Sequence, residues 1–286
     1  MKLHKIKIIS AFYNPGRFLD DCIGSLLTQD YENYEILFID DCSTDGSSEK
    51  IPSVVFKKDE NGNPIVDKDG RGIIENTHPL LKNTKCKNIT LWQSGNRRTA
   101  LENIHNGIMK FCTDVDDLVV LCDGDDRLLH KQSLSNLNQF YNENDCWMSW
   151  GSCFWSDGSK DFSSQYPEEE FKNLRKAPFR VSHLRSFFAG LYSAIRFQDT
   201  DYSCLKDKNG NFYKSCYDVP MIIPMLEMAG FEKSKHNSNK LYFYNRDNPI
   251  SDDKVDQKLQ SGIHREVLTK KPFKRISDFR TGDLLV

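Results

Sequence analysis

Short apolar runs alternate with segments of helical periodicity through the first half of the chain. Residues with strand-like character fall into four runs: Lys5–Ser10, Tyr34–Asp40, Ile89–Trp92 and Leu118–Cys122. Between them, apolar residues recur every three or four positions in Phe18–Leu27 and Leu101–Cys112, and Ser43–Ser48 offers N-cap residues for a short helix before Pro52. This alternation predicts an α/β fold with a mostly parallel central sheet and helices on both faces.

The pattern continues less regularly after the fourth strand. Leu134, Leu137 and Tyr141 indicate a further helix, and Trp147–Phe154 a further strand. The remainder is rich in aromatic residues, most of which we expect in the core. Within it, His183–Phe188 carries no motif that we can assign. Residues 57–87 are polar and contain Asn-Gly and Asp-Gly turn signals, so they predict a surface hairpin inserted between two strands.

Two acidic clusters follow strand-like runs directly. Asp40 and Asp41 end the second run, and Asp123, Asp125 and Asp126 follow the fourth. In a parallel sheet, ligands bind beyond the carboxyl ends of the strands, where both clusters would lie. Crowded carboxylates repel one another, and their hard oxygen atoms suit Mn²⁺ or Mg²⁺, which commonly also bind substrate phosphates. The alternative is that both clusters are ordinary solvated turns.

Composition restricts the possible classes of protein. The chain has 286 residues, of which 38% are hydrophobic and 28% charged, as in ordinary soluble proteins. A net charge of -2 argues against a nucleic-acid-binding surface. We find neither a signal-peptide core nor a transmembrane run of about 18 apolar residues. Nine cysteines without a C-x-x-C pair favour a reducing, cytoplasmic compartment.

Several motifs occur in a fixed order over the first part of the chain. They are Ile8–Asn14, Ser25–Tyr31, Ile39–Gly46 and Leu121–Asp126. In this order they resemble glycosyltransferase family 2, the inverting nucleotide-sugar transferases of GT-A fold. The resemblance implies a single GT-A-like, Rossmann-like domain over residues 1–286, with a nucleotide-sugar-binding half at 1–126 and a less regular acceptor-binding half at 127–286.

The resemblance also implies roles for individual residues on the donor side. Three groups of residues match nucleotide-binding positions: Ala11, Phe12 and Tyr13 beside the nucleoside; Asp40 and Asp41 at the base, typically uracil; and Arg97 and Arg98 near the diphosphate. Asp123 and Asp125 match the D-x-D motif that holds the ribose and the metal, and Asp126 completes its D-x-D-D form. The two arginines are equally consistent with solvated charge before a helix.

On the acceptor side, the segment from Tyr217 to Gly230 is similar to the family's helix that carries an acidic residue and ends in Ala-Gly. Asp218 is therefore the candidate general base, although Tyr217 stands where relatives more often have Glu. Asp218 would also suit a plain helix-capping role. Lys240–Asn248 resembles a late strand and loop that brings a His to the metal in many relatives; it contains no His, and Asp247 is a weak substitute.

The implied activity is metal-dependent transfer of a sugar from a nucleotide diphosphate to an acceptor hydroxyl by single in-line displacement. We expect a UDP-sugar donor, with a GDP-sugar second, and Mn²⁺ or Mg²⁺ as cofactor. The acceptor stays open among glycan, lipid-linked and protein-linked hydroxyls. Two alternatives remain: a sugar-phosphate nucleotidyltransferase, for which Asn14–Arg17 is a poor triphosphate loop, and a catalytically inactive nucleotide-sugar-binding module.

Overall fold

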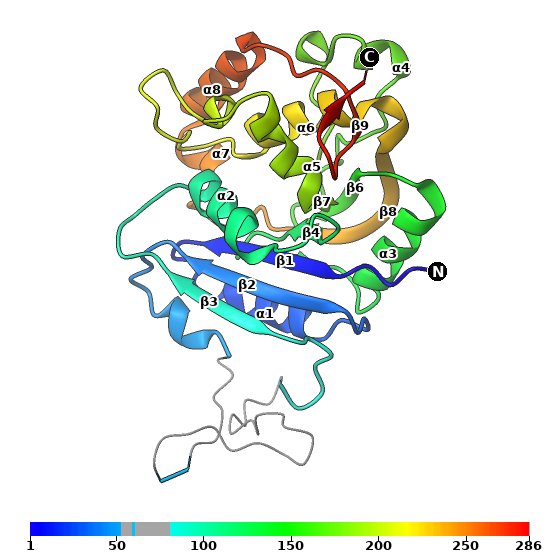
Figure 1. The fold of residues 1–286 in the computed structure, drawn as a ribbon. Helices are drawn as coiled ribbons and strands as arrows, with labels where there is room; N and C mark the ends of the chain where they lie inside the picture. Colours follow the sequence, from blue (N-terminus) through cyan, green and yellow to red (C-terminus); the bar gives the residue numbers. More distant parts are fainter. Residues whose placement is uncertain (53–58, 61–80, 286) are drawn as a thin grey trace.

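The computed structural model describes residues 1–52, 59, 60 and 81–285. In these residues, eight strands form one sheet in the order β3-β2-β1-β4-β7-β6-β8-β5, and β9 and β10 form a separate hairpin (Figure 1). The strands are β1 (Ile6–Phe12), β2 (Tyr34–Asp40), β3 (Ile89–Gln93), β4 (Leu118–Leu121), β5 (Arg127–Leu128), β6 (Met148–Trp155), β7 (Arg185–Phe188), β8 (Ser234–Tyr244), β9 (Ile276–Asp278) and β10 (Asp283–Leu284).

The helices lie on both sides of this sheet. They are α1 (Phe18–Leu27), α2 (Ala100–Phe111), α3 (Ser133–Asn144), α4 (Glu168–Phe171), α5 (Ala189–Ser193), α6 (Asp218–Lys233), α7 (Asp252–Val255) and α8 (Gln257–Thr269). The sequence patterns located the strands and the two long helices of the first half to within about two residues. The predicted helix before Pro52 is a single 3₁₀ turn, Ser47–Lys50.

The first half of the sheet is parallel, as predicted. β3, β2, β1 and β4 pair in parallel, with Ile9 of β1 between Leu37 of β2 and Leu121 of β4. β1, β2 and β4 are buried on both faces and largely apolar, as is typical of parallel strands inside a sheet, whereas β3 at the edge is only partly buried. Their carboxyl ends therefore meet at one edge of the sheet.

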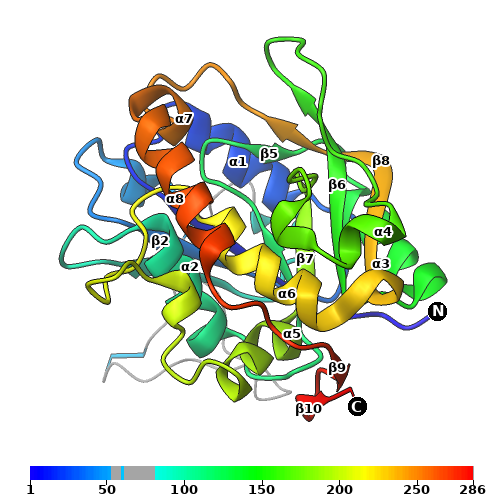
Figure 2. The same ribbon diagram turned by 90° about the horizontal axis from the view of Figure 1, so that it is seen from above.

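Strand alternation decides which helix covers which face. A Cβ atom added at Gly107 of α2 would lie 3.0 Å from Ile39 and 3.3 Å from Ile9, so α2 packs on the face that carries these side chains. Ser10 points to the other face, where its hydroxyl lies 3.7 Å from the Cys22 sulfur of α1. Seen from above, α6 lies over the second half of the sheet (Figure 2).

The second half of the sheet contains a strand that the sequence did not predict. β7 runs antiparallel to both β4 and β6, and all four of its residues are buried. Its register places Arg185 opposite Leu121, the last residue of β4. An antiparallel strand inserted here joins β6 and β8 to the parallel half, so the mixed sheet remains continuous.

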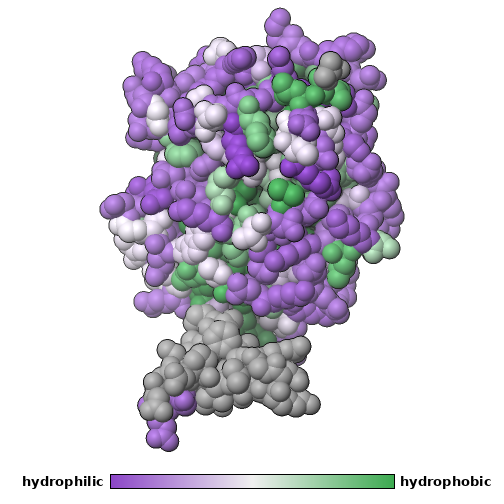
Figure 3. Space-filling model, in the orientation of Figure 1, coloured by the Kyte–Doolittle hydropathy of each residue, from purple (hydrophilic) through white to green (hydrophobic). Residues whose placement is uncertain are grey.

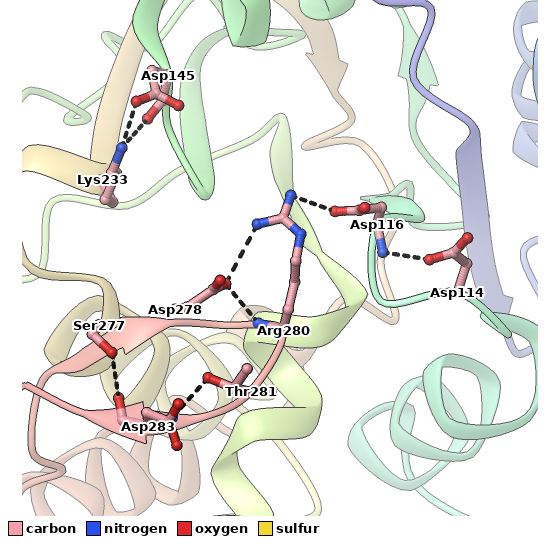
Figure 4. A network of polar contacts seen from close by, with 9 residues as sticks. All are labelled: Asp114, Asp116, Asp145, Lys233, Ser277, Asp278, Arg280, Thr281 and Asp283. Atoms are coloured by element: carbon pink, nitrogen blue, oxygen red, sulfur yellow. Dashed lines mark hydrogen bonds and ion pairs between the residues drawn. The ribbon is translucent and has the colours of Figure 1, made fainter.

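The β9–β10 hairpin is tied to the body of the protein by Arg280 (Figure 4). The Arg280 guanidinium contacts Asp278 within the hairpin and Asp116, which precedes β4, at 2.8 Å. Next to the hairpin, Phe279 stacks on Phe188 with ring centroids 5.1 Å apart. These groups fasten the last part of the described chain to the sheet.

Residues 57, 58 and 61–80 of the hairpin predicted at 57–87 lie outside the described residues. In the orientation of Figure 1, most of the surface is hydrophilic, with smaller apolar areas between polar ones (Figure 3). Among the described residues, no helix has the length and apolar character needed to cross a membrane.

Two glycines offer a test of the packing at the β9–β10 hairpin. A Cβ atom at Gly190 would lie 2.6 Å from the Phe279 ring and 3.0 Å from the Val115 carbonyl oxygen, whereas one at Gly24 of α1 would meet no atom within 4 Å. We expect Gly190→Ala to lower the free energy of unfolding by about 1–3 kcal/mol through overpacking. The control Gly24→Ala should raise it by about 0.5–1 kcal/mol, because Ala favours the helix. Urea unfolding measures both free energies. Equal changes in the two variants would contradict the close packing of Gly190 against Phe279.

Candidate active site

A cleft of about 300 Å³ opens at the carboxyl ends of the parallel strands. Its walls come from the loops after β1, β2 and β4, the start of α2, the start of α6 and the loop after β8. Nine residues predicted from the sequence line it: Ala11, Phe12, Tyr13, Asp41, Arg97, Arg98, Asp123, Asp125 and Asp218. The fold thus brings the donor-side and acceptor-side candidates into one space.

The acidic loop after β4 is held close to β1 by its glycine. A Cβ atom at Gly124 would lie only 2.4 Å from the Cβ atom of Phe12, so no other residue fits there without a shift. The amide of Gly124 donates to the carbonyl oxygen of Ala11 at 3.3 Å, continuing the ladder between β1 and β4. Asp123 and Asp125 are thereby placed beside the nucleoside-side residues.

Asp126 connects the acidic loop to β8 and does not line the cleft. One carboxylate oxygen accepts the Tyr242 hydroxyl at 2.8 Å, and the other accepts the backbone amide of Asn245 at 2.7 Å. The Tyr242 hydroxyl also accepts the Asp123 amide at 3.0 Å. Burial, followed by the charges of Asp125 and Asp123, raises the pKa of Asp126 well above its ordinary value. Both carboxylate oxygens of Asp126 are therefore engaged in contacts that hold the loop to β8 and the residues after it.

Asp123 and Asp218 are linked by two residues that the sequence did not single out for this purpose. The Tyr217 hydroxyl lies 2.8 and 2.9 Å from the two carboxylate oxygens of Asp123 and donates to them. The Arg185 guanidinium donates to the Tyr217 oxygen at 2.9 Å and to Asp218 Oδ2 at 3.0 Å. Burial raises the pKa of Asp123 to about 6, against the opposing effect of the Arg185 charge.

Asp218 is the first residue of α6, but it does not form the usual cap. Its Oδ1 accepts the amide of the next residue, Val219, at 3.0 Å and not an amide two or three positions into the helix. The Cys216 thiol lies 3.6 Å from the same oxygen. Because the carboxylate is held by Arg185 and partly faces the cleft, helix capping alone does not account for its position.

A histidine does reach the acidic loop, although the sequence suggested none. His183, from the segment before β7, is buried and stacks between Tyr242 and Tyr244, with ring centroids 4.6 and 5.0 Å away. One ligand atom each of Asp123, Asp126 and His183 lie within 4.8 Å of one another. Burial, aided by the charge of Arg185, lowers the pKa of His183, so its imidazole is neutral and can bind a cation.

The loop after β8 contributes an asparagine where the sequence suggested an aspartate. Asn248 donates its side-chain amide to Asp125 Oδ2 at 2.6 Å, and both residues line the cleft. Asp247 is exposed and does not line the cleft. The Asp247 amide instead donates to the side chain of Asn245 at 2.9 Å, which turns the loop so that Asn248 faces inward.

Where the sequence predicts the nucleoside, Asp41 and Arg97 line the cleft together with Tyr13. Asp41 accepts the Arg98 amide at 2.8 Å, and its other oxygen lies 3.3 Å from Arg97 Nε. The Arg97 guanidinium covers the Tyr13 ring, 3.2 Å from the ring centroid. Asp40 is buried below them and accepts the Ser43 amide at 2.8 Å and the Ser48 hydroxyl, so it shapes the loop.

The comparisons with known proteins agree with this architecture. Residues 7–92 match the family described as Glycosyl transferase family 2. Glycosyltransferase GlyG of Streptococcus pneumoniae serotype 4 (strain ATCC BAA-334 / TIGR4) is 33% identical over 67 residues, which are 23% of this chain and 22% of that protein. The alignment thus covers under a quarter of GlyG. These findings support the predicted resemblance to glycosyltransferase family 2, whose model matches residues 7–92, and the predicted enzyme class, a glycosyltransferase.

Solved structures show the same fold at low sequence identity. A crystal structure of S. aureus TarS 1-349 in complex with UDP-GlcNAc has a TM-score of 0.51 and 15% identity, covering 85% of this chain and 59% of that one. The mannosyltransferase PcManGT from Pyrobaculum calidifontis, in complex with GDP-Man and Mn²⁺, has a TM-score of 0.51 and 12% identity, covering 85% and 57%. The predicted GT-A fold is confirmed.

Removing the Tyr242 hydroxyl tests whether β8 holds the acidic loop. Tyr242→Phe keeps the ring but removes the hydroxyl partner of Asp126 Oδ2 and of the Asp123 amide. We expect the free energy of unfolding to fall by about 1–3 kcal/mol and nucleotide binding to weaken. Tyr34→Phe is the control, because it removes a buried hydroxyl that donates to Leu26 at the opposite edge of the sheet. Tyr34→Phe should destabilise the protein without changing nucleotide affinity. Equal losses of nucleotide affinity in the two variants would show that Tyr242 does not hold the acidic loop in place.

Proposed function

We propose that this protein is a metal-dependent, inverting glycosyltransferase that transfers a sugar from a UDP-sugar to an acceptor hydroxyl. The observation that carries the proposal is that Asp218 lines the same cleft as Asp123 and Asp125 of the acidic loop. A carboxylate that can accept a proton thus shares one cleft with residues suited to a nucleotide diphosphate. No covalent enzyme nucleophile is needed for a single displacement.

The nucleotide-sugar donor would bind to the loops that follow the parallel strands. Tyr13 and Arg97 form a flat, partly exposed pair at the cleft, and Asp41 lies beside them with polar edges. A nucleotide base stacked on this pair could donate a hydrogen bond to the Asp41 carboxylate. The TarS complex with UDP-GlcNAc and the PcManGT complex with GDP-Man share the fold, so we favour a UDP-sugar and keep a GDP-sugar second.

The residues at the acidic loop fit a divalent cation. Asp125 and Asp123 supply hard carboxylate oxygens, and the neutral ring of His183 has an Nδ1 atom without a hydrogen-bond partner among the described residues. Oxygen donors with one imidazole suit Mn²⁺ or Mg²⁺. When bound, such a cation offsets the negative charge that develops on the leaving diphosphate. Asp126 would support the loop, with both of its oxygens already hydrogen-bonded.

Asp218 would act as the general base. It lies at the start of α6, with one carboxylate oxygen on Arg185 and the other on the Val219 amide. A carboxylate has about four lone-pair positions, so these contacts leave room for an acceptor hydroxyl. The carboxylate would take the hydroxyl proton as the oxygen attacks the anomeric carbon from the side opposite the leaving diphosphate, which inverts the configuration.

The geometry after β1 disfavours a nucleotidyltransferase. Such an enzyme needs free backbone amides in this loop to hold a triphosphate. Here the Asn14 amide donates to the Ser43 hydroxyl at 2.9 Å, and the Gly16 amide donates to Asp45 at 2.9 Å. These two amides are therefore already hydrogen-bonded to the loop that follows β2 and are not available to bind phosphate groups.

We expect Asp125→Asn to abolish the metal-dependent part of UDP binding while the fold remains intact, because a ligand charge is lost from a cleft-facing loop. Calorimetric titration of UDP with and without Mn²⁺ measures this part directly. Asp145→Asn is the control, since Asp145 is exposed and pairs with Lys233 away from the cleft (Figure 4). If Mn²⁺ strengthens UDP binding to Asp125→Asn as much as to the wild type, Asp125 is not a ligand.

A second variant addresses the base. Asp218→Asn keeps the shape but removes basicity, so turnover should fall by about 10²-fold or more, with donor affinity nearly unchanged. Asp256→Asn is the matched control, because Asp256 caps α8 by accepting the Leu259 amide at 2.8 Å and Asn caps equally well. Turnover of Asp218→Asn within a few-fold of wild type, at equal thermal stability, would remove Asp218 from the mechanism.

A further inference from the structure

Arg185 is an arginine that lines the cleft and is nevertheless buried. Only 6% of the residue is exposed, and its two terminal nitrogens serve different partners: Nη1 donates to Tyr217, and Nη2 donates to Asp218. Burial opposes a charge, but the neighbouring Tyr217, Asp218 and Asp123 outweigh this effect and raise the pKa of Arg185. The guanidinium is therefore a fixed, permanent cation between these groups.

Tyr217 extends this contact to the donor side. Burial and the charge of Asp123 raise the pKa of Tyr217, so its hydroxyl stays protonated. The hydroxyl accepts from Arg185 at 2.9 Å and donates to Asp123 at 2.8 Å. The hydrogen bonds run in one direction, from the guanidinium through the tyrosine to the carboxylate.

The strand register determines the position of Arg185, the first residue in this series of hydrogen bonds. Arg185 is the first residue of β7, directly opposite Leu121 of β4, and Asp123 follows two residues after Leu121. Because alternate residues of a strand share a face, Arg185 and Asp123 both point toward the start of α6. A planar fork can bond two partners in different directions at once, whereas the single ammonium of a lysine cannot hold the same geometry.

We infer that Arg185 is a positioning residue of the active site, which fixes the carboxylate of Asp218 directly and that of Asp123 through Tyr217, so that the acceptor-side base and the donor-side acid keep one relative position. The inference rests on the proposed function, since it assigns Arg185 a role through the base. Displacing a catalytic group by about 1 Å can lower a rate by about 10²-fold, so small shifts here matter.

The experiment compares Arg185→Lys and Arg185→Ala with wild type, using UDP-sugar hydrolysis or transfer, donor affinity and thermal stability. We expect kcat to fall by about 10²-fold for Arg185→Ala and by about 10-fold for Arg185→Lys, with a smaller change in donor KM. Guanidinium at millimolar concentration, far below the molar range that unfolds proteins, should restore part of the kcat of Arg185→Ala. If Arg185→Ala does not fold, Arg185→Lys carries the test.

Arg175→Lys is the matched control. The side chain of Arg175 is also largely shielded, at 7% exposed, with Nε and Nη2 bonded to the two carboxylate oxygens of Glu227 at 2.7 and 2.8 Å, but Arg175 does not line the cleft. Its substitution should lower thermal stability and leave kcat within a few-fold of wild type. A purely structural role of Arg185 predicts the same behaviour at both positions.

The decisive measurement is the kcat of a double variant. If Arg185 acts through Asp218, adding Arg185→Lys to Asp218→Asn should lower kcat little further, because groups that act as a unit are not additive. Fully additive losses, or single variants within about 2-fold of wild-type kcat, would overturn the inference. An inactive wild type would instead count against the proposed function, so the two failures are distinguishable.

Discussion

The mutual repulsion of carboxylates in one cleft is the constraint on which the rest of this site depends. Asp123, Asp125 and Asp218 line the same space, and Asp126 lies directly behind them. Each carboxylate has at least one neutral or cationic donor: Tyr217 for Asp123, Asn248 for Asp125, Arg185 for Asp218, and Tyr242 with Asn245 for Asp126. These donors hold the acids in place for a ligand that needs them together.

The strand order of the mixed sheet brings these hydrogen-bond donors to the carboxylates. The parallel half brings Asp41 and the acidic loop to one edge, because parallel strands end on the same side. Antiparallel β7 returns along β4 and places Arg185 and His183 against that edge, while β8 delivers Tyr242 and its following loop delivers Asn248. The parallel and mixed parts of the sheet are therefore joined directly by strand pairing between β4 and β7.

The sequence predicted the parallel half well and the second half poorly, for physical reasons. β1, β2 and β4 are largely apolar runs, and acidic residues follow β2 and β4, so periodicity located the strands and ligand chemistry singled out Asp41, Asp123 and Asp125. β7 has only four residues and includes Arg185, so it lacks the length and apolar continuity of a buried strand. His183, Arg185 and Asn248 reach the cleft through pairings between distant segments, which local patterns do not encode. The motif for α6 did identify Asp218, but not the partners that hold it.

The proposed mechanism depends on a divalent cation held by the acidic loop and His183 beside a nucleotide diphosphate, in the cleft that Asp218 also lines. Anomalous diffraction from crystals grown with Mn²⁺ and UDP tests it most directly. The account predicts one manganese peak in contact with Asp125, with the diphosphate next to it and the uracil near Tyr13 and Asp41. A UDP molecule bound elsewhere, or bound in this cleft with manganese present and no peak at Asp125, would contradict it.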